Sequence, residues 1–430
     1  MLNNIKFFLL SICFIVIVPF VTFGQSWTAQ SVPTITTKYT WVFATDSMHA
    51  YATAFDTKNV MQTFDGGTTW SAYELSTTNM DLLDVFFLDE DNGWIVGVDL
   101  GTFANIMFKT IDGGVSWQNI SSTISTIGTT PNCIRYITPM VGYIGGEFSA
   151  GVYITVDGGQ TWSTQNVPWP SGDPQYSKQV LRISTSQTGF ITMLGIDNLN
   201  TGFVFSSDNN FKNSISINLL TGSGATIRDA FNIDNTGYVV SSDGIHKTAN
   251  SGANWNQILS NSNFNANLTP LTTWFITPNI GWIAGYHQSG NSTSIMKTID
   301  GGNTWLPELS GSQVFNSISL IKSNNNSIHG WAVGNNGVIF KYSDNSNITT
   351  GVDYIQLQRN DLDVFPNPTN GIFTITTNDK NIIIYDILGK KVPFSIIHEN
   401  NTKTQLDFTD QKPGIYFVTT NESSIKVIKE

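Results

Sequence analysis

A short motif built around Asp-Gly-Gly recurs along this chain of 430 residues. The strings FDGGTTW, IDGGVSW, VDGGQTW and IDGGNTW occupy residues 64–70, 111–117, 156–162 and 299–305, and a degenerate copy, ANSGANW, occupies residues 249–255. Two further copies, at Asp208 and Asp344, lack the tryptophan. The seven positions of the motif aspartate are separated by 47, 45, 51, 42, 50 and 44 residues. Such a period is the signature of a repeat architecture.

A glycine followed by an aromatic residue recurs in phase with this motif. These pairs start at Gly93, Gly142, Gly189, Gly237, Gly281 and Gly330, each 13 to 19 residues before a motif aspartate position, and Ala50-Tyr51 fills the slot in the first unit. Each unit thus predicts four short strands, the content of one propeller blade. The sequence therefore predicts an all-β protein, with a seven-bladed β-propeller followed by a small C-terminal β-sandwich.

The two ends of the repeat region complement each other. The last unit has no tryptophan strand after Asp344, whereas residues 26–29 read Ser-Trp-Thr-Ala, much like the strand that begins at Trp70. We predict that the N-terminal strand completes the seventh blade. The ring would then close without a free strand edge.

The chemistry of the Asp-Gly-Gly turn is local. Two glycines supply the positive φ angles of a tight hairpin, and a short acidic side chain can accept N–H bonds from its own turn. The tryptophan can bury a large area against a neighbouring sheet. A metal-binding or catalytic role for the aspartates is the alternative, but a motif that recurs in every unit points to the fold rather than to a site.

These repeats resemble the Asp-box propellers, which are known from sialidases, and more closely the photosystem II assembly and stability factor family. That family repeats Gly-Trp strands and DGG-x-T-W turns in seven blades. The resemblance covers residues 25–350, and it implies a fold rather than a particular ligand.

The first 24 residues have the features of a signal peptide. Lys6 precedes an apolar run over residues 7–23, and Thr22 and Gly24 are small enough for cleavage before Gln25. A transmembrane anchor is the alternative, but the run is short for a bilayer, so we expect no transmembrane segment in the mature protein. Cleavage leaves Cys133 as the one cysteine, which excludes an intrachain disulfide and suits a small core residue.

The last 80 residues differ from the repeats. We assign residues 351–361 to a linker and residues 362–430 to a β-sandwich that contains the strings VFPNPTNGIFTI, NIIIYDILGKKV and LDFTDQKPGIYFV, in that order. These strings resemble the Por-type (type IX) secretion system sorting domain. The resemblance implies delivery through the periplasm to the cell surface or the medium, with the type IX machinery as a partner. An immunoglobulin-like binding module is the alternative, but it does not explain the ordered strings.

Candidate ligand-binding residues are the three arginines of the propeller, Arg135, Arg182 and Arg228. They lie 7, 7 and 9 residues before their Gly-aromatic glycines, so simple strand alternation would put them on matching faces of three consecutive blades. There they could bind an anionic ligand by bidentate hydrogen bonds. The alternative is that they form structural salt bridges.

Other function classes find less support. A net charge of −11 argues against nucleic acid as a partner. The five histidines are scattered, and we predict no metal, no cofactor and no catalytic residue. The favoured function is an exported, non-enzymatic binding or scaffold propeller with an anionic or glycan ligand or an extracellular protein as its partner. The alternatives are a sialidase-like Asp-box glycoside hydrolase and a glycan-binding adhesin.

The sorting assignment predicts the fate of a truncated chain. Deletion of residues 360–430 should leave the protein in the periplasm, because the export signal is lost. Immunoblots of periplasm, surface and medium measure this outcome. Normal surface delivery of the truncated chain would contradict the assignment.

Overall fold

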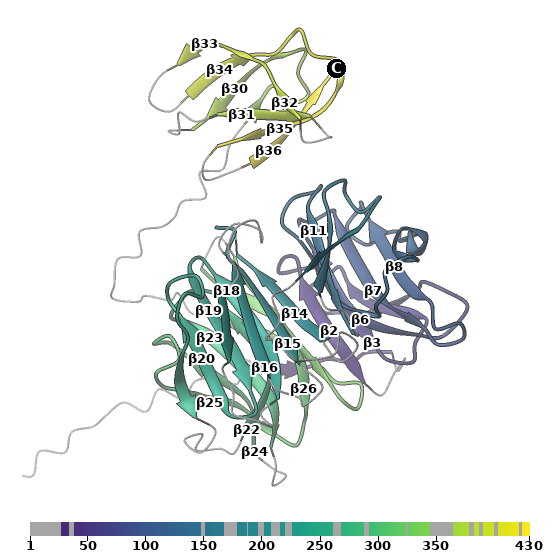
Figure 1. The fold of residues 1–430 in the computed structure, drawn as a ribbon, viewed down its shortest axis with the longest axis vertical. Coiled ribbons are helices and arrows are strands. Elements are labelled where there is room, and N and C mark those ends of the chain that lie inside the picture. The colour runs from purple at the N-terminus through teal and green to yellow at the C-terminus, as the bar shows by residue number, and fades with distance from the viewer. Residues whose placement is uncertain are drawn as a thin grey trace, which may run out of the picture.

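The computed structural model describes both β regions of the chain (Figure 1). The described residues are 27–33, 38–147, 151–166, 179–186, 188–196, 202–207, 216–219, 226–260, 268–287, 292–323, 326–344, 364–377, 382–386, 390–399, 403–420 and 424–430. The predicted signal peptide (1–24), the predicted linker (351–361) and Asp208 lie outside these residues.

Residues 27–344 form seven four-stranded antiparallel sheets, the blades. The first three are β2 (Tyr39–Ala44), β3 (Ala50–Ala54), β4 (Asn59–Thr63) and β5 (Ser71–Glu74); β6 (Met80–Phe87), β7 (Gly93–Asp99), β8 (Asn105–Thr110) and β9 (Gln118–Asn119); and β10 (Pro131–Tyr136), β11 (Gly142–Gly146), β12 (Gly151–Thr155) and β13 (Ser163–Asn166). The fourth and fifth are β14 (Gln179–Thr185), β15 (Ile191–Ile196), β16 (Gly202–Ser207) and β17 (Ser216–Leu219); and β18 (Ile227–Ile233), β19 (Thr236–Ser241), β20 (Gly244–Thr248) and β21 (Asn256–Ser260). The last two are β22 (Leu268–Phe275), β23 (Gly281–His287), β24 (Ser292–Thr298) and β25 (Leu306–Gly311); and β26 (Phe315–Lys322), β27 (Ile328–Gly334), β28 (Ile339–Asp344) and β1 (Trp27–Ala29). One 3₁₀ turn, Ser121–Ile124, is the single helical element among the described residues.

The blades form a closed ring. The first strand of each blade, its inner strand, packs against the inner strand of the next, and the purple β2 lies beside the green β26 in Figure 1. The N-terminal strand β1 pairs with β28 through Trp27 and Tyr342, Thr28 and Lys341, and Ala29 and Phe340. The predicted seven-bladed propeller and its closure by the N-terminal strand are therefore confirmed.

The Asp-Gly-Gly turns have the predicted local chemistry. In the turn between β8 and β9, Gly113 and Gly114 have φ angles of 66° and 78°. The Asp112 carboxylate accepts the Ser116 N–H at 2.9 Å and the hydroxyls of Ser116 and Thr110 at 2.6 and 2.7 Å. These hydrogen bonds stabilise the ionised form, so the pKa of Asp112 lies below its usual value. The same bonds recur at Asp65, Asp157 and Asp300.

In three blades the glycine of the Gly-aromatic pair makes room for a ring. A Cβ on Gly93, Gly142 or Gly281 would lie 2.6, 2.7 or 2.3 Å from an aromatic side chain at the end of the inner strand of the same blade. The aromatic residue that follows the glycine stacks on the next blade, as Trp94 does on Tyr136 with ring centroids 3.8 Å apart. The pair therefore packs each blade against its neighbour.

Residues 364–430 form two further four-stranded sheets. One contains β29 (Val364–Phe365), β30 (Ile372–Thr376), β34 (Lys403–Asp407) and β33 (Ser395–Glu399), and the other contains β32 (Lys391–Val392), β31 (Ile383–Asp386), β35 (Gly414–Thr419) and β36 (Ser424–Lys429). Side chains from both sheets share one core that includes Phe373, Ile384, Leu406 and Val418. This is the predicted β-sandwich.

Ring closure has a polar contact that the sequence did not reveal. Glu308 occupies a β-bulge of β25, and its Oε2 accepts the indole N–H groups of Trp27 at 2.9 Å and Trp282 at 2.7 Å. Lys297 lies 3.6 Å from the other carboxylate oxygen. The bulge thus aims a carboxylate at the closing strand.

Ring closure yields a prediction with a matched control. Trp27→Phe keeps the aromatic ring but removes the N–H bond to Glu308. Trp70→Phe removes an N–H group that has no hydrogen-bond partner among the described residues. We expect Trp27→Phe to lower the free energy of unfolding by about 1.5–3 kcal/mol more than Trp70→Phe, the range for a bond to a charged group. Chemical denaturation measures both, and equal losses would contradict a closing role for Glu308.

Candidate functional site

All seven inner strands carry a β-bulge at the same place. The residue directly after the bulge differs from blade to blade, and in chain order these residues are Trp41, Asp84, Cys133, Arg182, Asp229, Thr272 and Ser317. Since the inner strands form the ring, these residues make one layer around its axis. The layer contains two acidic side chains and one arginine, and it is the candidate site.

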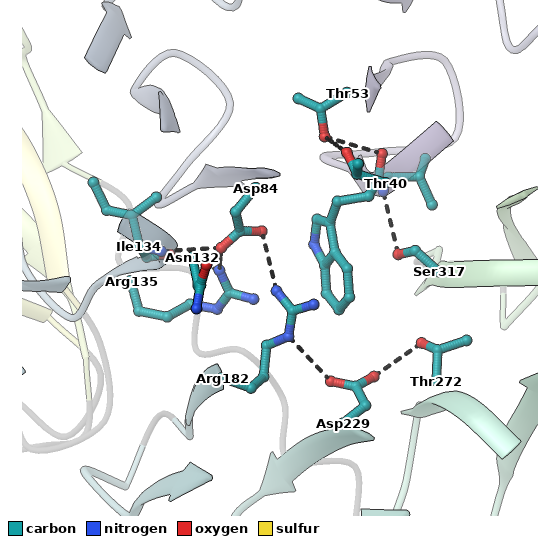
Figure 2. A network of polar contacts seen from close by, with 12 residues as sticks. Thr40, Thr53, Asp84, Asn132, Ile134, Arg135, Arg182, Asp229, Thr272 and Ser317 are labelled. Atoms are coloured by element: carbon teal, nitrogen blue, oxygen red, sulfur yellow. Dashed lines mark hydrogen bonds and ion pairs between the residues drawn. The ribbon is translucent and has the colours of Figure 1, made fainter. Parts of the chain in front are cut away.

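An ion-pair network joins four of the blades in this layer (Figure 2). Arg135 Nη1 donates to Asp84 Oδ2 at 2.6 Å. The Arg182 guanidinium lies between two carboxylates, with Nη1 3.9 Å from Asp84 Oδ1 and Nε 3.6 Å from Asp229 Oδ1. Its centre also lies 3.8 Å from the ring centroid of Trp41, a cation–π contact.

The carboxylates of the network also bind backbone groups of the following blade. Asp84 Oδ2 accepts the Ile134 N–H at 3.0 Å, and Asp229 Oδ2 accepts the Thr273 N–H at 3.1 Å and the Thr272 hydroxyl at 2.9 Å. Each carboxylate therefore joins two neighbouring blades.

The network is buried, so a charge in it that lost its partner would be unfavourable. The side chains of Asp84 and Asp229 are 0% and 3% exposed, and those of Arg135 and Arg182 are 10% and 16% exposed. Burial raises the pKa of Asp229 above its usual value, although the charge of Arg182 and the bonds from Thr273 and Thr272 act in the opposite direction. Two arginines face two carboxylates, so the four charges balance.

The structure separates the three predicted arginines. Arg182 is the first residue after the bulge of its strand and pairs with Leu194, whereas Arg135 is the third residue after the bulge and pairs with Tyr143. Arg228 is itself the bulge residue of β18. Residues two positions apart lie on the same face of a strand, so Arg135 and Arg182 have the predicted matching faces, whereas Arg228, at the bulge, does not share their position. Arg135 and Arg182 meet at Asp84, and Arg228 does not join them.

Arg228 differs from the other two in its partners. It is half-buried and forms no ion pair with the residues that the structure describes, and its Nε, like that of Arg182, has no hydrogen-bond partner among them. At the equivalent bulge positions, Thr40, Asn132 and Asn316 bind backbone carbonyls of the following blade. Arg228 thus carries a positive charge that no carboxylate among the described residues neutralises.

A hollow of about 380 Å³ lies among the loops between the first and second strands of blades two to four. It is lined by the hydroxyl side chains of Thr185, Ser186 and Thr188 and by Leu88, Tyr136 and Ile137. The Thr188 hydroxyl binds the Asp234 carbonyl at 3.0 Å.

Cys133, possible metal ligands and a possible membrane-spanning segment are the other features considered in the sequence. Cys133 is fully buried, and burial raises the pKa of its thiol to about 11. The described residues bring no three His, Cys, Asp or Glu side chains together as metal ligands. The same residues contain no helix long and apolar enough to span a membrane.

Comparison with protein families decides what the propeller is related to. Residues 21–343 match the family described as photosynthesis system II assembly factor YCF48. The chain belongs to this family. The resemblance to photosystem II assembly factors is thereby confirmed. No curated protein matches the chain.

Solved structures of YCF48 have the same fold. A structure titled "YCF48 bound to D1 peptide" has a TM-score of 0.57 at 21% identity and covers 75% of this chain and 98% of its own. YCF48 from Cyanidioschyzon merolae has a TM-score of 0.54 at 18% identity and covers 74% and 98%. A GH74 enzyme from Niastella koreensis, at 10% identity, covers 94% and 74% with a TM-score of 0.49, and a likeness at that score carries no argument about activity.

The C-terminal region matches a second family. Residues 363–430 match the secretion system C-terminal sorting domain. This match confirms the predicted route, which is type IX secretion to the cell surface or the outside of the cell. The propeller of this YCF48 family member is therefore exported.

The ion-pair network yields a prediction about stability. Arg182→Met should lower the free energy of unfolding by about 3–5 kcal/mol, because it leaves the buried Asp84 and Asp229 carboxylates without their shared cation. Arg228→Met should change it less, since Arg228 has no ion pair among the described residues. Urea denaturation compares the two variants. A smaller loss for Arg182→Met than for Arg228→Met would contradict the network.

Proposed function

We propose that this exported propeller binds a peptide segment of another surface or extracellular protein, without catalysis, and that Arg228 contacts an acidic group of that peptide. The observation that carries the proposal is the charge balance of the inner strands. Arg135 and Arg182 are opposed by Asp84 and Asp229, whereas Arg228 has no such carboxylate among the described residues. A half-buried guanidinium with an unused N–H group is suited to bind a carboxylate.

The sequence hypothesis named all three arginines as ligand contacts, and the proposal narrows this set to Arg228. An anion that approached Arg182 would have to displace Asp84 and Asp229 from a buried position. Removal of either partner from a buried ion pair is costly, because the other charge stays in a poorly solvated place. Arg135 and Arg182 are therefore better suited to hold the ring.

The ligand class follows from the family. One YCF48 structure has the D1 peptide bound. That complex belongs to the other protein, and only the class of ligand, a peptide, is proposed for this chain. An exported chain meets different proteins, so the source of the peptide would be the cell surface or the medium.

A glycan is the second candidate ligand, and the hollow on blades two to four favours it. Hydroxyl side chains beside apolar walls can bind a sugar. The described lining residues include no carboxylate, whereas glycoside hydrolysis uses a pair of them. The hollow therefore suits an adhesin better than a hydrolase.

Binding assays with Arg228→Gln test the proposal. The probe is an array of peptides that differ in acidic side chains and in free or amidated C-termini. We expect the wild type to prefer acidic members and Arg228→Gln to bind them at least about tenfold more weakly, since a charged hydrogen bond contributes about 1.5–3 kcal/mol. Arg228→Lys is the matched control, because it keeps the charge, and an unchanged melting temperature shows that each variant folds.

Two results would contradict the proposal. One is equal peptide binding by the wild type and Arg228→Gln. The other is binding on a glycan array, with no peptide binding, that persists in Arg228→Gln, which would favour the adhesin.

A further inference from the structure

The turn between β7 and β8 displays a phenylalanine in solvent. Phe103 is 79% exposed, more than any other large hydrophobic side chain among the described residues. Single exposed hydrophobic residues are common and need no explanation by themselves. Phe103 is unusual because its backbone is also in the left-handed region, with φ at 56°.

Neither the backbone nor hydration favours phenylalanine at this position. The left-handed region costs a residue with a Cβ about 1–2 kcal/mol, and asparagine and aspartate tolerate it best. The corresponding turns of the first and seventh blades place Asp56 and Asn336 at their left-handed positions, with φ at 48° and 59°. The turn can therefore be built with a polar residue, and the fold does not require Phe103.

The turn that carries Phe103 is held rigidly. The Asp99 carboxylate accepts the N–H groups of Gly101 and Thr102 at 3.0 and 2.8 Å, and the hydroxyls of Thr102 and Thr78 at 2.9 and 2.6 Å. The Phe103 N–H donates to the Asp99 carbonyl at 2.8 Å. A backbone fixed in this way loses little conformational entropy when a partner covers the turn.

A chain of hydrogen bonds links the turn to two further carboxylates. The Leu100 N–H donates to the Asn79 carbonyl at 3.0 Å, and the Asn79 amide donates to Asp56 Oδ1 at 2.8 Å. The Asp56 N–H in turn donates to Asp81 Oδ1 at 2.9 Å. Asp99 thus lies in the turn itself, and Asp56 and Asp81 are linked to it through Asn79. Of the lysines on the same side, Lys58 is 3.5 Å from Glu74 and Lys38 lies 4.7 Å from the Phe55 ring centroid. The border of the exposed ring is acidic.

We propose that Phe103 is the central contact of a docking site for a partner protein that offers an apolar pocket bordered by lysine or arginine. Aromatic residues buried at the centre of an interface contribute most of its binding energy, and opposite charges at the border select the partner. The site goes beyond the proposed function, because it lies on the second blade and uses no contact of Arg228. In an antiparallel blade this turn also lies on the side of the ring opposite the hollow.

Phe103→Asn gives a test in which stability and binding move in different directions. A side chain with a purely structural role would lower the melting temperature when replaced. We expect Phe103→Asn to keep or raise the melting temperature, because asparagine relieves the left-handed backbone. The same variant should lose the docking partner.

The probe is a random peptide library displayed on phage, selected on the wild-type full-length protein and counter-selected on Phe103→Asn. We expect the recovered peptides to combine lysine or arginine with apolar residues and to bind Phe103→Asn at least about tenfold more weakly, with an affinity that falls as salt is raised. Ile111→Asn is the control, because Ile111 is 70% exposed but lies in an Asp-Gly-Gly turn. It should leave binding unchanged.

Three outcomes would overturn the docking site. The first is that no peptide distinguishes the wild type from Phe103→Asn. The second is that Phe103→Asn lowers the melting temperature, which would give Phe103 a structural role. The third is that Ile111→Asn weakens binding as much as Phe103→Asn does.

Discussion

The free edge of the inner strand is the constraint on which the ring depends. In each blade the inner strand pairs on one side only, so its other edge presents N–H and C=O groups to the centre of the ring. Buried groups of this kind need partners. The side chains of the preceding blade supply several of them, since Val42 N–H donates to the Ser317 hydroxyl at 3.2 Å and Ala44 N–H to Ser319 at 3.0 Å. Asp84 and Asp229 accept backbone N–H groups of the following blade in the same way, through their carboxylates.

The positions of two arginines follow from this constraint. A carboxylate that caps a buried N–H group carries a charge into a region with little solvent, where an unpaired charge is unfavourable. Arg135 and Arg182 neutralise Asp84 and Asp229, and the bulges set the register at which they meet. The equal spacing of Arg135 and Arg182 before their Gly-aromatic pairs thus has a structural cause. Arg228, a bulge residue, is the one that this account does not explain.

The sequence predicted those features whose chemistry is local. The Asp-Gly-Gly turn closes within seven residues, so its glycines and its aspartate could be assigned from the motif, as Asp112 shows. Closure by the N-terminal strand was predictable because a strand was missing at one end and present at the other. The site was not predictable in the same way. Arg135 and Asp84 are 51 residues apart in the chain, and Trp27 and Glu308 are 281 apart. A bulge in β25, which periodicity does not show, aims Glu308.

Residues that the repeat does not require are the best guide to what this propeller does. Each blade can be built from a turn, a glycine–aromatic pair and a capped inner edge. Phe103 occupies a turn that Asn336 and Asp56 build in other blades, and Arg228 occupies a bulge that Asn132 and Asn316 fill with a capping amide. The same bulge holds Leu83, Leu181 and Leu271 in three further blades, so the fold requires neither arginine at the bulge nor phenylalanine in the turn. We propose contacts with other molecules at these two positions, because no contact among the described residues accounts for them.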